Sequence, residues 1–144
     1  MKTNNESKLN LKPVRYIVIT DSTAKSSRRL RSLLKLTSYY CLVDCFKKSS
    51  ELTTTPIFYT PDCAIVEIRS LYSLFSIKKK IQDLREAIPG IKPVLFYNTL
   101  CRYPLLEQKF KEYDRFYAHE DENIQLQCLE TALQDNNSSQ HTHT

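Results

Sequence analysis

Polar side chains that can take part in chemistry stand directly after short apolar runs at several places in this chain. They are Asp21 and Ser22 after RYIVIT, Glu67 after CAIV, Asn98 and Thr99 after PVLFY, and His119 and Glu120 after DRFYA. Gathered in one place, these carboxylates, hydroxyls, amide and imidazole would form a polar pocket. Asp21 and Glu67 supply carboxylate oxygens of the kind that bind Mg²⁺, so a metal site at this pair is one alternative.

The hydrophobic pattern predicts the elements that must bring these groups together. Short apolar, β-branched runs predict strands over residues 15–20, 39–46, 62–68, 93–97 and 114–118. Apolar residues three or four apart predict one helix that starts at Ser22 or Thr23, and further helices over 71–88, 102–113 and 121–134. The segment 47–56 is polar and predicts a loop with room for one helical turn.

Strands that alternate with helical segments predict an α/β fold. We expect a doubly wound, five-stranded parallel sheet with helices on both faces, a three-layer sandwich over residues 14–134. Residues 1–13 and 135–144 are polar and are expected to be flexible tails, the second of which could start a linker. The carboxyl ends of parallel strands meet at one edge of the sheet, where ligands bind. The polar groups should therefore converge there.

Composition narrows the classes of protein further. The 144 residues suffice for one domain, and the net charge of +5 permits an acidic partner. A single glycine, Gly90, excludes a Gly-rich phosphate loop. The five cysteines include no C-x-x-C pair, so reduced thiols are expected rather than a zinc site. His141 and His143 lie in the polar C-terminal tail, where they would chelate a metal only weakly.

The sequence also allows predictions about cellular location and about binding to membranes and nucleic acids. No apolar run reaches the roughly 18–20 residues of a membrane helix, and the polar N-terminus MKTNNESKLNLKP lacks the apolar core of a signal peptide. We expect a cytoplasmic protein with no membrane partner. The basic positions within 25–35 and 78–80 are expected to be solvated. Nucleic acid is not expected to bind through this domain, because that would need basic residues interleaved with exposed aromatics on one face.

Four strings, in chain order, resemble the receiver domain of two-component response regulators. IVITDSTAKSSRRLRSLLK is similar to the first strand, acidic pair and first helix of a receiver, and PDCAIVEI to the strand that ends in the phosphorylated aspartate. PGIKPVLFYNT is similar to the fourth strand with its hydroxyl residue, and YDRFYAHE to the fifth strand. The resemblance covers roughly residues 14–134 and implies a flavodoxin-like (βα)5 fold that serves signal transduction.

Matched position by position, the site that the resemblance implies is incomplete. The acidic pair of a receiver corresponds to Asp21 and Ser22, and its phosphoacceptor aspartate corresponds to Glu67. The hydroxyl residue corresponds to Asn98 or Thr99, and the lysine corresponds to His119. Serine removes a charge from the metal site, glutamate is one methylene too long, and histidine is not a fixed cation as lysine is. Because misplacing a nucleophile by about an ångström costs on the order of 10²-fold in rate, we expect no conventional phosphorylation and no Mg²⁺ cofactor.

The expected protein is thus a degenerate receiver, or pseudo-receiver, that works by protein–protein interaction and is not an enzyme. Two interpretations of Glu67 stay open: it could mimic the phosphorylated state by pairing with His119, or the pocket could have drifted. One alternative function is the N-terminal regulatory domain of a longer two-component transcriptional regulator. A third is a small metal-dependent phosphatase that uses Asp21 and Glu67.

The resemblance also implies where a partner would bind. In receiver domains the fourth helix, fifth strand and fifth helix form a face that carries partner or dimer contacts. Here that face corresponds to residues 102–112, 115–117 and 123–133, and includes Arg102, Phe116 and Tyr117 as switch or interface residues. The expected partner is a protein, such as a histidine kinase or a transcriptional regulator, or a second copy of this chain.

Overall fold

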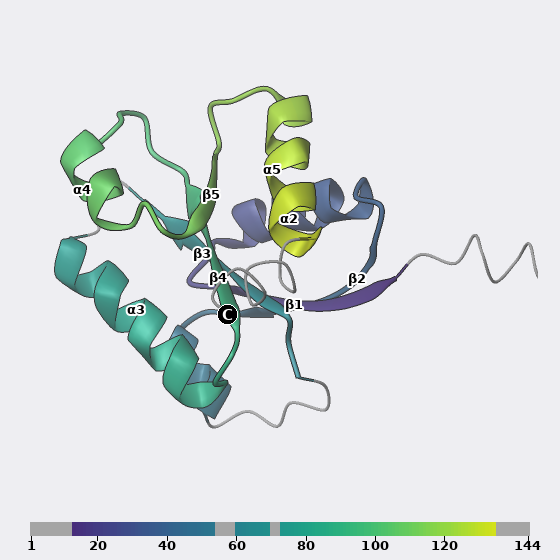
Figure 1. The fold of residues 1–144 in the computed structure, drawn as a ribbon, viewed down its shortest axis with the longest axis horizontal. Helices are drawn as coiled ribbons and strands as arrows, with labels where there is room; N and C mark the ends of the chain where they lie inside the picture. The colour runs from purple at the N-terminus through teal and green to yellow at the C-terminus, as the bar shows by residue number, and fades with distance from the viewer. Residues whose placement is uncertain (1–12, 54–59, 70–72, 135–144) are drawn as a thin grey trace, which may run out of the picture.

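The computed structural model describes residues 13–53, 60–69 and 73–134, whose arrangement is shown in Figure 1. The two predicted tails, with His141 and His143, lie outside the described residues except for Pro13. The same holds for residues 54–56 of the polar segment and for residues 71 and 72, at which the second long helix was expected to start.

Five strands of the described chain form one parallel sheet in the order β2-β1-β3-β4-β5. They are β1 (Val14–Thr20), β2 (Tyr40–Phe46), β3 (Cys63–Ile68), β4 (Lys92–Tyr97) and β5 (Asp114–Tyr117). Every residue of the central strand β3 is buried, as its unbroken apolar run predicts for a strand covered on both faces. The prediction of a doubly wound, parallel α/β sheet is confirmed.

Helices cover both faces of this sheet, as Figure 1 shows. On one face lie α2 (Ala24–Lys35) and α5 (Glu122–Gln134). On the other lie α3 (Leu74–Ala87), α4 (Pro104–Lys109) and a short 3-10 helix, η1 (Ser49–Thr53). Among the described residues of the polar segment 47–56, only η1 is helical, in agreement with the single turn expected there.

Local chemistry sets the ends of the helices. The hydroxyl of Thr23 accepts from the backbone N–H of Ser26 and caps α2, and Ser73 and Ser76 form a reciprocal capping box at the start of α3. After α3, Gly90 takes a left-handed conformation with φ of 89°. The helix expected over 102–113 is shorter than predicted, because the chain leaves the helical conformation at Phe110, whose side chain is buried in the core.

The core has two halves, one on each face of the sheet. Aliphatic side chains of α2 and α5 fill one half and those of α3 fill the other. Between β4 and β5, aromatic rings stack in pairs: Phe96 on Phe116 at 4.8 Å and Tyr97 on Tyr117 at 5.3 Å between centroids. Alternation along the strands sends the phenylalanines into one half and Tyr97 into the other.

None of the helices in the described ranges is long and apolar enough to cross a membrane. A cytoplasmic location stays a prediction.

Candidate functional site

The carboxylate of Glu67 lies at the point where three elements meet. Glu67 is fully buried near the end of β3, the strand at the centre of the sheet. Its Oε2 accepts hydrogen bonds from Ser26 Oγ in the first turn of α2, at 2.8 Å, and from Asn98 Nδ2 just after β4, at 2.6 Å. Its Oε1 accepts from the backbone N–H of Thr23 at 3.3 Å and lies 3.6 Å from the guanidinium of Arg69.

These contacts engage both oxygens of the Glu67 carboxylate, with three hydrogen bonds and one ion pair. A carboxylate offers about four lone-pair sites, and each Glu67 oxygen already faces two donor groups of the protein. The amide of Asn98 also donates to Ser26 Oγ at 3.4 Å, which closes a small network. Glu67 therefore ties the start of α2 to the ends of β3 and β4.

A magnesium ion, which the resemblance to receiver domains implies, does not fit these residues. Mg²⁺ needs about six oxygen ligands at about 2.0–2.1 Å, but both oxygens of Glu67 already accept hydrogen bonds from the protein and Asp21 Oδ1 lies 3.4 Å from the ammonium of Lys80. Within the described ranges, no three His, Cys, Asp or Glu side chains are grouped so that they could hold a metal ion. The pair Asp21 and Glu67 is thus a poor metal site.

Asp21 follows β1 in a left-handed conformation, with φ of 59°. Its side chain is buried, and its Oδ2 accepts no hydrogen bond from the residues that the structure describes. Burial raises the pKa of the Asp21 carboxyl and outweighs the opposing effect of Lys80. The hydroxyls of Thr20 and Ser22 beside it are likewise buried, with no hydrogen-bond partner in that part of the chain.

Replacing Asp21 by asparagine is therefore expected to stabilise the protein at pH 7. Since the folded-state pKa is raised, the favourable contribution of Asp21 is present below its unfolded value of 3.8 and is lost as the pH rises through the folded value. Asparagine also tolerates the left-handed backbone. Urea unfolding should give a higher midpoint for Asp21→Asn at pH 7 and no gain at pH 3.

The exposed ion pair of Asp83 with Lys79, at 3.5 Å, provides the matched control. Asp83→Asn should change the free energy of unfolding by less than about 0.5 kcal/mol. A lower midpoint for Asp21→Asn than for the parent chain at pH 7 would mean that the pair with Lys80 outweighs burial.

The other residues that the sequence singled out do not join the Glu67 network. The ring of His119 is exposed and lies against Tyr117, with 5.5 Å between centroids, so the pairing of His119 with Glu67 is not made in this structure. Thr99 donates its hydroxyl proton to the carbonyl of Cys101 at 2.6 Å. Phe116 is fully buried on Phe96, which places it in the core and away from the surface where a partner was expected.

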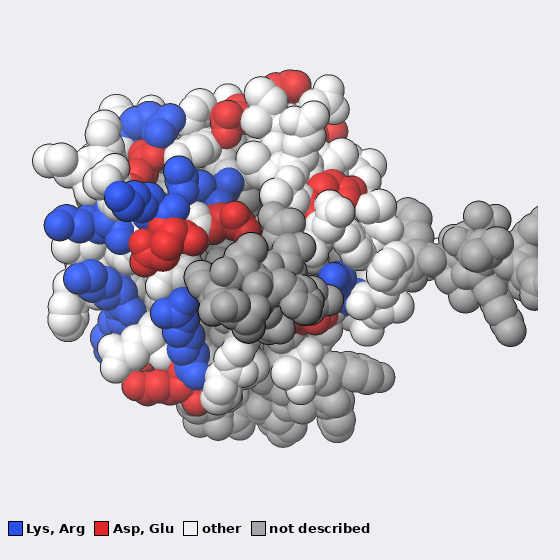
Figure 2. Space-filling view, in the orientation of Figure 1, with Lys and Arg blue, Asp and Glu red and all other residues white. Residues whose placement is uncertain are grey.

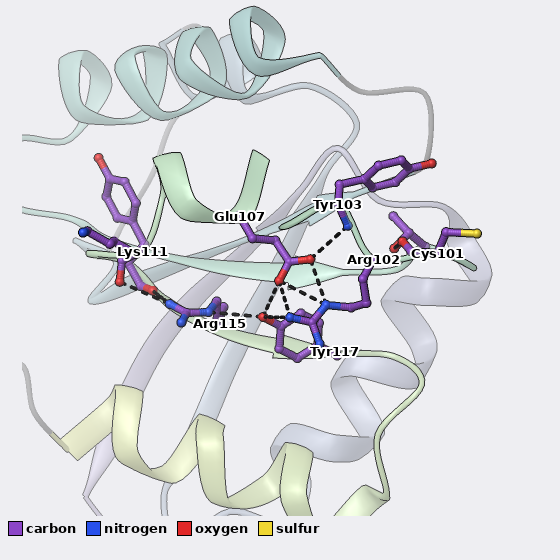
Figure 3. A network of polar contacts seen from close by, with 9 residues as sticks. Cys101, Arg102, Tyr103, Glu107, Lys111, Arg115 and Tyr117 are labelled. Carbon is purple, nitrogen blue, oxygen red and sulfur yellow. Dashed lines mark hydrogen bonds and ion pairs between the residues drawn. The ribbon is translucent and has the colours of Figure 1, made fainter. Parts of the chain in front are cut away.

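A second polar cluster, which sequence reasoning missed, surrounds Glu107 of α4 (Figure 3). The guanidinium of Arg102 donates to both carboxylate oxygens of Glu107, at distances of 2.6–3.1 Å. The hydroxyl of Tyr117 and the backbone N–H of Tyr103 donate to the same carboxylate at 2.7 and 3.2 Å. Arg115 in turn donates from Nε to the Tyr117 hydroxyl at 3.2 Å.

The electrostatics of this cluster follow from its contacts. Burial acts to raise the pKa of Glu107, but the hydrogen bonds from Arg102, Tyr117 and the Tyr103 backbone together hold it below its ordinary value. Burial, and then the neighbouring Glu107, raise the pKa of Tyr117. Arg102 also lies over the Tyr117 ring at 4.3 Å, a cation–π contact. The arrangement fixes the link between β4 and α4 against β5.

The basic surface of α3 and α4 has mixed charge. Figure 2 shows Lys and Arg side chains gathered over these two helices, with acidic side chains among them. A groove of about 350 Å³ there includes Lys78, Lys109, Glu86 and Glu112 in its lining. Opposite charges interspersed in this way favour the solvated surface that the sequence predicts for residues 78–80.

Several solved structures with the same arrangement are receiver domains or response regulators. The chain is similar to the signal receiver domain of an HD domain-containing protein from Pseudomonas fluorescens, with a TM-score of 0.60 and 18% identity over 88% of this chain and 98% of that one. It is also similar to a response regulator receiver domain protein from Clostridium thermocellum, with a TM-score of 0.59 and 12% identity over 90% and 99% of the two chains.

A third similar structure is a pilus assembly protein, CpaE, from Caulobacter crescentus, with a TM-score of 0.59 and 10% identity over 85% of this chain and 96% of that one. No family model matches the sequence, and no curated protein matches it. At these identities the likeness concerns the fold alone. The five parallel strands, their order and the helices on both faces give this chain the CheY-like fold of response-regulator receiver domains.

Proposed function

We propose that this chain is a degenerate receiver domain that acts in signal transduction through protein–protein interaction, without phosphorylation at the acceptor position. The observation that carries this proposal is the engagement of Glu67: its carboxylate is fully buried, and both oxygens are bound by donors of the protein itself.

Phosphoryl transfer needs a nucleophilic oxygen that can meet the phosphorus in line, and positive charge that is placed on the phosphoryl group. To attack, Glu67 would have to give up its bonds to Ser26 and Asn98. Arg69, the nearest cation to Glu67, already faces the carboxylate. Phosphoryl transfer to Glu67 would thus break the contacts that hold the end of the sheet together. This supports a structural role for Glu67.

Glu67 supports a single fixed state of the domain. A receiver's phosphoryl group is added and removed, whereas the carboxyl group of Glu67 is a fixed part of the chain that holds the start of α2 and the residue after β4. Of the two interpretations left open by the sequence, we therefore propose the fixed state, with Thr23, Ser26 and Asn98 as the partners of Glu67 in place of His119.

Receiver domains in general interact with proteins such as kinases and effectors, and we propose a protein partner for this chain. Large apolar side chains at the start of α4 are exposed: Leu100 fully, Leu105 at 87% and Tyr103 at 40%. They flank Arg102, which the Glu107 cluster holds in place. An ordered apolar surface of this kind suits a protein contact and belongs to the face that the receiver resemblance implies.

The proposal is tested by adding Mg²⁺ and beryllofluoride, which stands in for a phosphoryl group, to the ¹⁵N-labelled chain. The amide resonances of Asp21, Glu67 and Asn98 are expected to stay unchanged, because both oxygens of the Glu67 carboxylate are already held by donors of the protein. The spectrum of Glu67→Ala provides the reference for an opened pocket. Saturable shifts at these amides in the parent chain, or a gain in mass on Glu67 with acetyl phosphate, would overturn the proposal.

A further inference from the structure

A surface pocket of about 470 Å³ lies where β1, β2 and β3 end, beside η1 and the first turns of α3. Its lining comes from segments far apart in the sequence: Asp21 after β1, Lys47 and Lys48 after β2, Arg69 after β3, and Phe75 in α3. The pocket is at the carboxyl ends of parallel strands, where α/β proteins bind ligands. Its volume is in the range of about 300–1,000 Å³ that small-molecule ligands occupy.

The charges in this pocket favour an anion. Cationic side chains outnumber carboxylates in its lining: Lys47, Lys48, Arg69, Lys79 and Lys80 against Asp21 and Asp83. Three of the cations face carboxylates, in the pairs Arg69–Glu67, Lys79–Asp83 and Lys80–Asp21.

Lys47 and Lys48 make up the excess of positive charge. Both are exposed, and neither forms an ion pair with a carboxylate within the described ranges of the chain. Two exposed lysines in the lining of one pocket, with no carboxylate partner among the described residues, suit a phosphate group.

An exposed aromatic ring borders the same pocket. Phe75, at the start of α3, has 76% of its surface exposed, although it is among the largest apolar side chains of the protein. A flat apolar ring beside lysines is the arrangement on which nucleobases stack while phosphates meet the cations. The hydroxyls of Ser49 and Ser76 also line the pocket.

The floor of the pocket offers an unused acceptor. Asp21 lines it, and Asp21 Oδ2 is buried with no hydrogen bond from the described residues. An unmade hydrogen bond to a buried carboxylate oxygen is costly. A hydroxyl of a bound molecule, or a water held by it, would remove that cost once it reached this oxygen.

From these features we infer that the pocket binds a nucleotide, with Lys47 and Lys48 at the phosphates and the ring of Phe75 stacked on the base. The phosphates are held by side chains because a chain with one glycine has no Gly-rich loop to cradle them. This inference does not rest on the proposed function, since none of the groups that bind the ligand is Glu67 or one of its hydrogen-bond donors.

The experiment measures binding of a fluorescent nucleotide, mant-ADP, to the full chain by anisotropy, in competition with unlabelled molecules. The mant group is excited at longer wavelengths than the tyrosines of the chain absorb, so the protein's own fluorescence does not interfere. ADP is expected to displace the probe best, followed by pyrophosphate and then adenosine. A single-stranded oligonucleotide that competes better than ADP would support the same chemistry and identify a nucleic-acid strand as its source.

Two variants separate the phosphate contacts from the base contact. Lys47→Gln with Lys48→Gln should weaken both ADP and pyrophosphate about tenfold, since two exposed charge contacts are lost. Phe75→Ala should weaken ADP about tenfold and leave pyrophosphate unchanged, since only the base stacks. Lys35→Gln and Leu36→Ala, exposed residues at the end of α2, are the matched controls and should change neither.

Each other outcome contradicts the inference. The nucleotide site is wrong if ADP at millimolar concentration does not displace the probe, or if the two lysine substitutions leave its affinity unchanged. It is also wrong if Phe75→Ala weakens ADP and pyrophosphate equally. Displacement by an acidic peptide in preference to ADP would assign the pocket to a protein partner.

Discussion

Glu67→Ala is expected to lower the free energy of unfolding by about 3 kcal/mol, the largest effect of any substitution at the sheet ends. Glu67 is fully buried, and its removal leaves the Ser26 hydroxyl, the Asn98 amide and the Thr23 N–H without their acceptor. Each buried donor left unpaired costs about 1–3 kcal/mol, and the missing side chain leaves a cavity as well. Urea unfolding followed by circular dichroism measures the loss.

Two substitutions make this test specific. Glu67→Gln keeps the shape of the side chain and one acceptor oxygen, but its NH₂ group replaces the other oxygen and faces donor groups of the protein. The loss of unfolding free energy should therefore be smaller than for alanine, about 1–2 kcal/mol. Glu112→Ala removes an exposed glutamate and should change stability by less than about 0.5 kcal/mol. If Glu67→Ala matched Glu112→Ala, Glu67 would not tie the sheet ends together. If Glu67→Ala failed to fold, the amide variant would still measure the contribution.

Glu107→Ala is expected to lower the free energy of unfolding by about 2–3 kcal/mol, because Arg102, Tyr117 and the Tyr103 N–H lose their common acceptor. Arg102, Tyr117 and the Tyr103 N–H all donate to this carboxylate (Figure 3). Hydrogen bonds to a charged group contribute about 1.5–3 kcal/mol each when buried, and the exposure of Arg102 reduces the contribution of the ion pair. Chemical unfolding at pH 7 is the measurement, with Glu112→Ala as the matched control.

A double-mutant cycle with Arg102→Ala isolates the pair. The coupling between Arg102 and Glu107 should be positive and about 1 kcal/mol or more, since the two groups share a bidentate contact. A coupling near zero would show that the stabilisation comes from Tyr117 and the backbone instead.

The contribution of Glu107 to stability should depend on pH in a definite direction. The folded-state pKa of Glu107 lies below its ordinary value of 4.5, so its stabilising contribution is present above pH 4.5 and is lost as the pH falls through the folded value. Glu107→Gln should therefore be less stable than the parent chain at pH 7, and the difference should shrink steadily below pH 4.5. A difference that is constant between pH 7 and pH 3 would contradict the lowered pKa.

The sequence was sufficient for the fold because the fold depends on local and periodic signals. The unbroken run from Cys63 to Ile68 marks a strand buried on both faces, and apolar residues three or four apart mark α3 along its length. The placing of Glu67, Asn98 and Asp21 at the carboxyl ends of strands also followed from pattern, since the order of elements determines which ends face the same edge.

The Glu107 cluster could not be predicted from local or periodic sequence patterns. Arg102 and Glu107 are five positions apart, a spacing that is not a helical neighbour distance, and Tyr117 comes from another element. The receiver resemblance had named Arg102 and Tyr117 as switch or interface residues, but no pattern in the sequence linked them to Glu107. The prediction would also have needed the direction in which each side chain of β5 points. In the structure, Tyr117 points toward Glu107 while its neighbour Phe116 is buried in the core.

The sequence by itself determined which residues could meet at the strand ends, because periodicity and chain order are properties of the chain alone. Only the tertiary structure decided what those residues do there. Hydrogen-bond partners depend on distances of a few tenths of an ångström between elements far apart in sequence. Such distances make Ser26 and Asn98 the hydrogen-bond donors to Glu67 and place the ring of His119 against Tyr117. The tertiary structure also brings Lys47, Lys48 and Phe75 into the lining of one pocket.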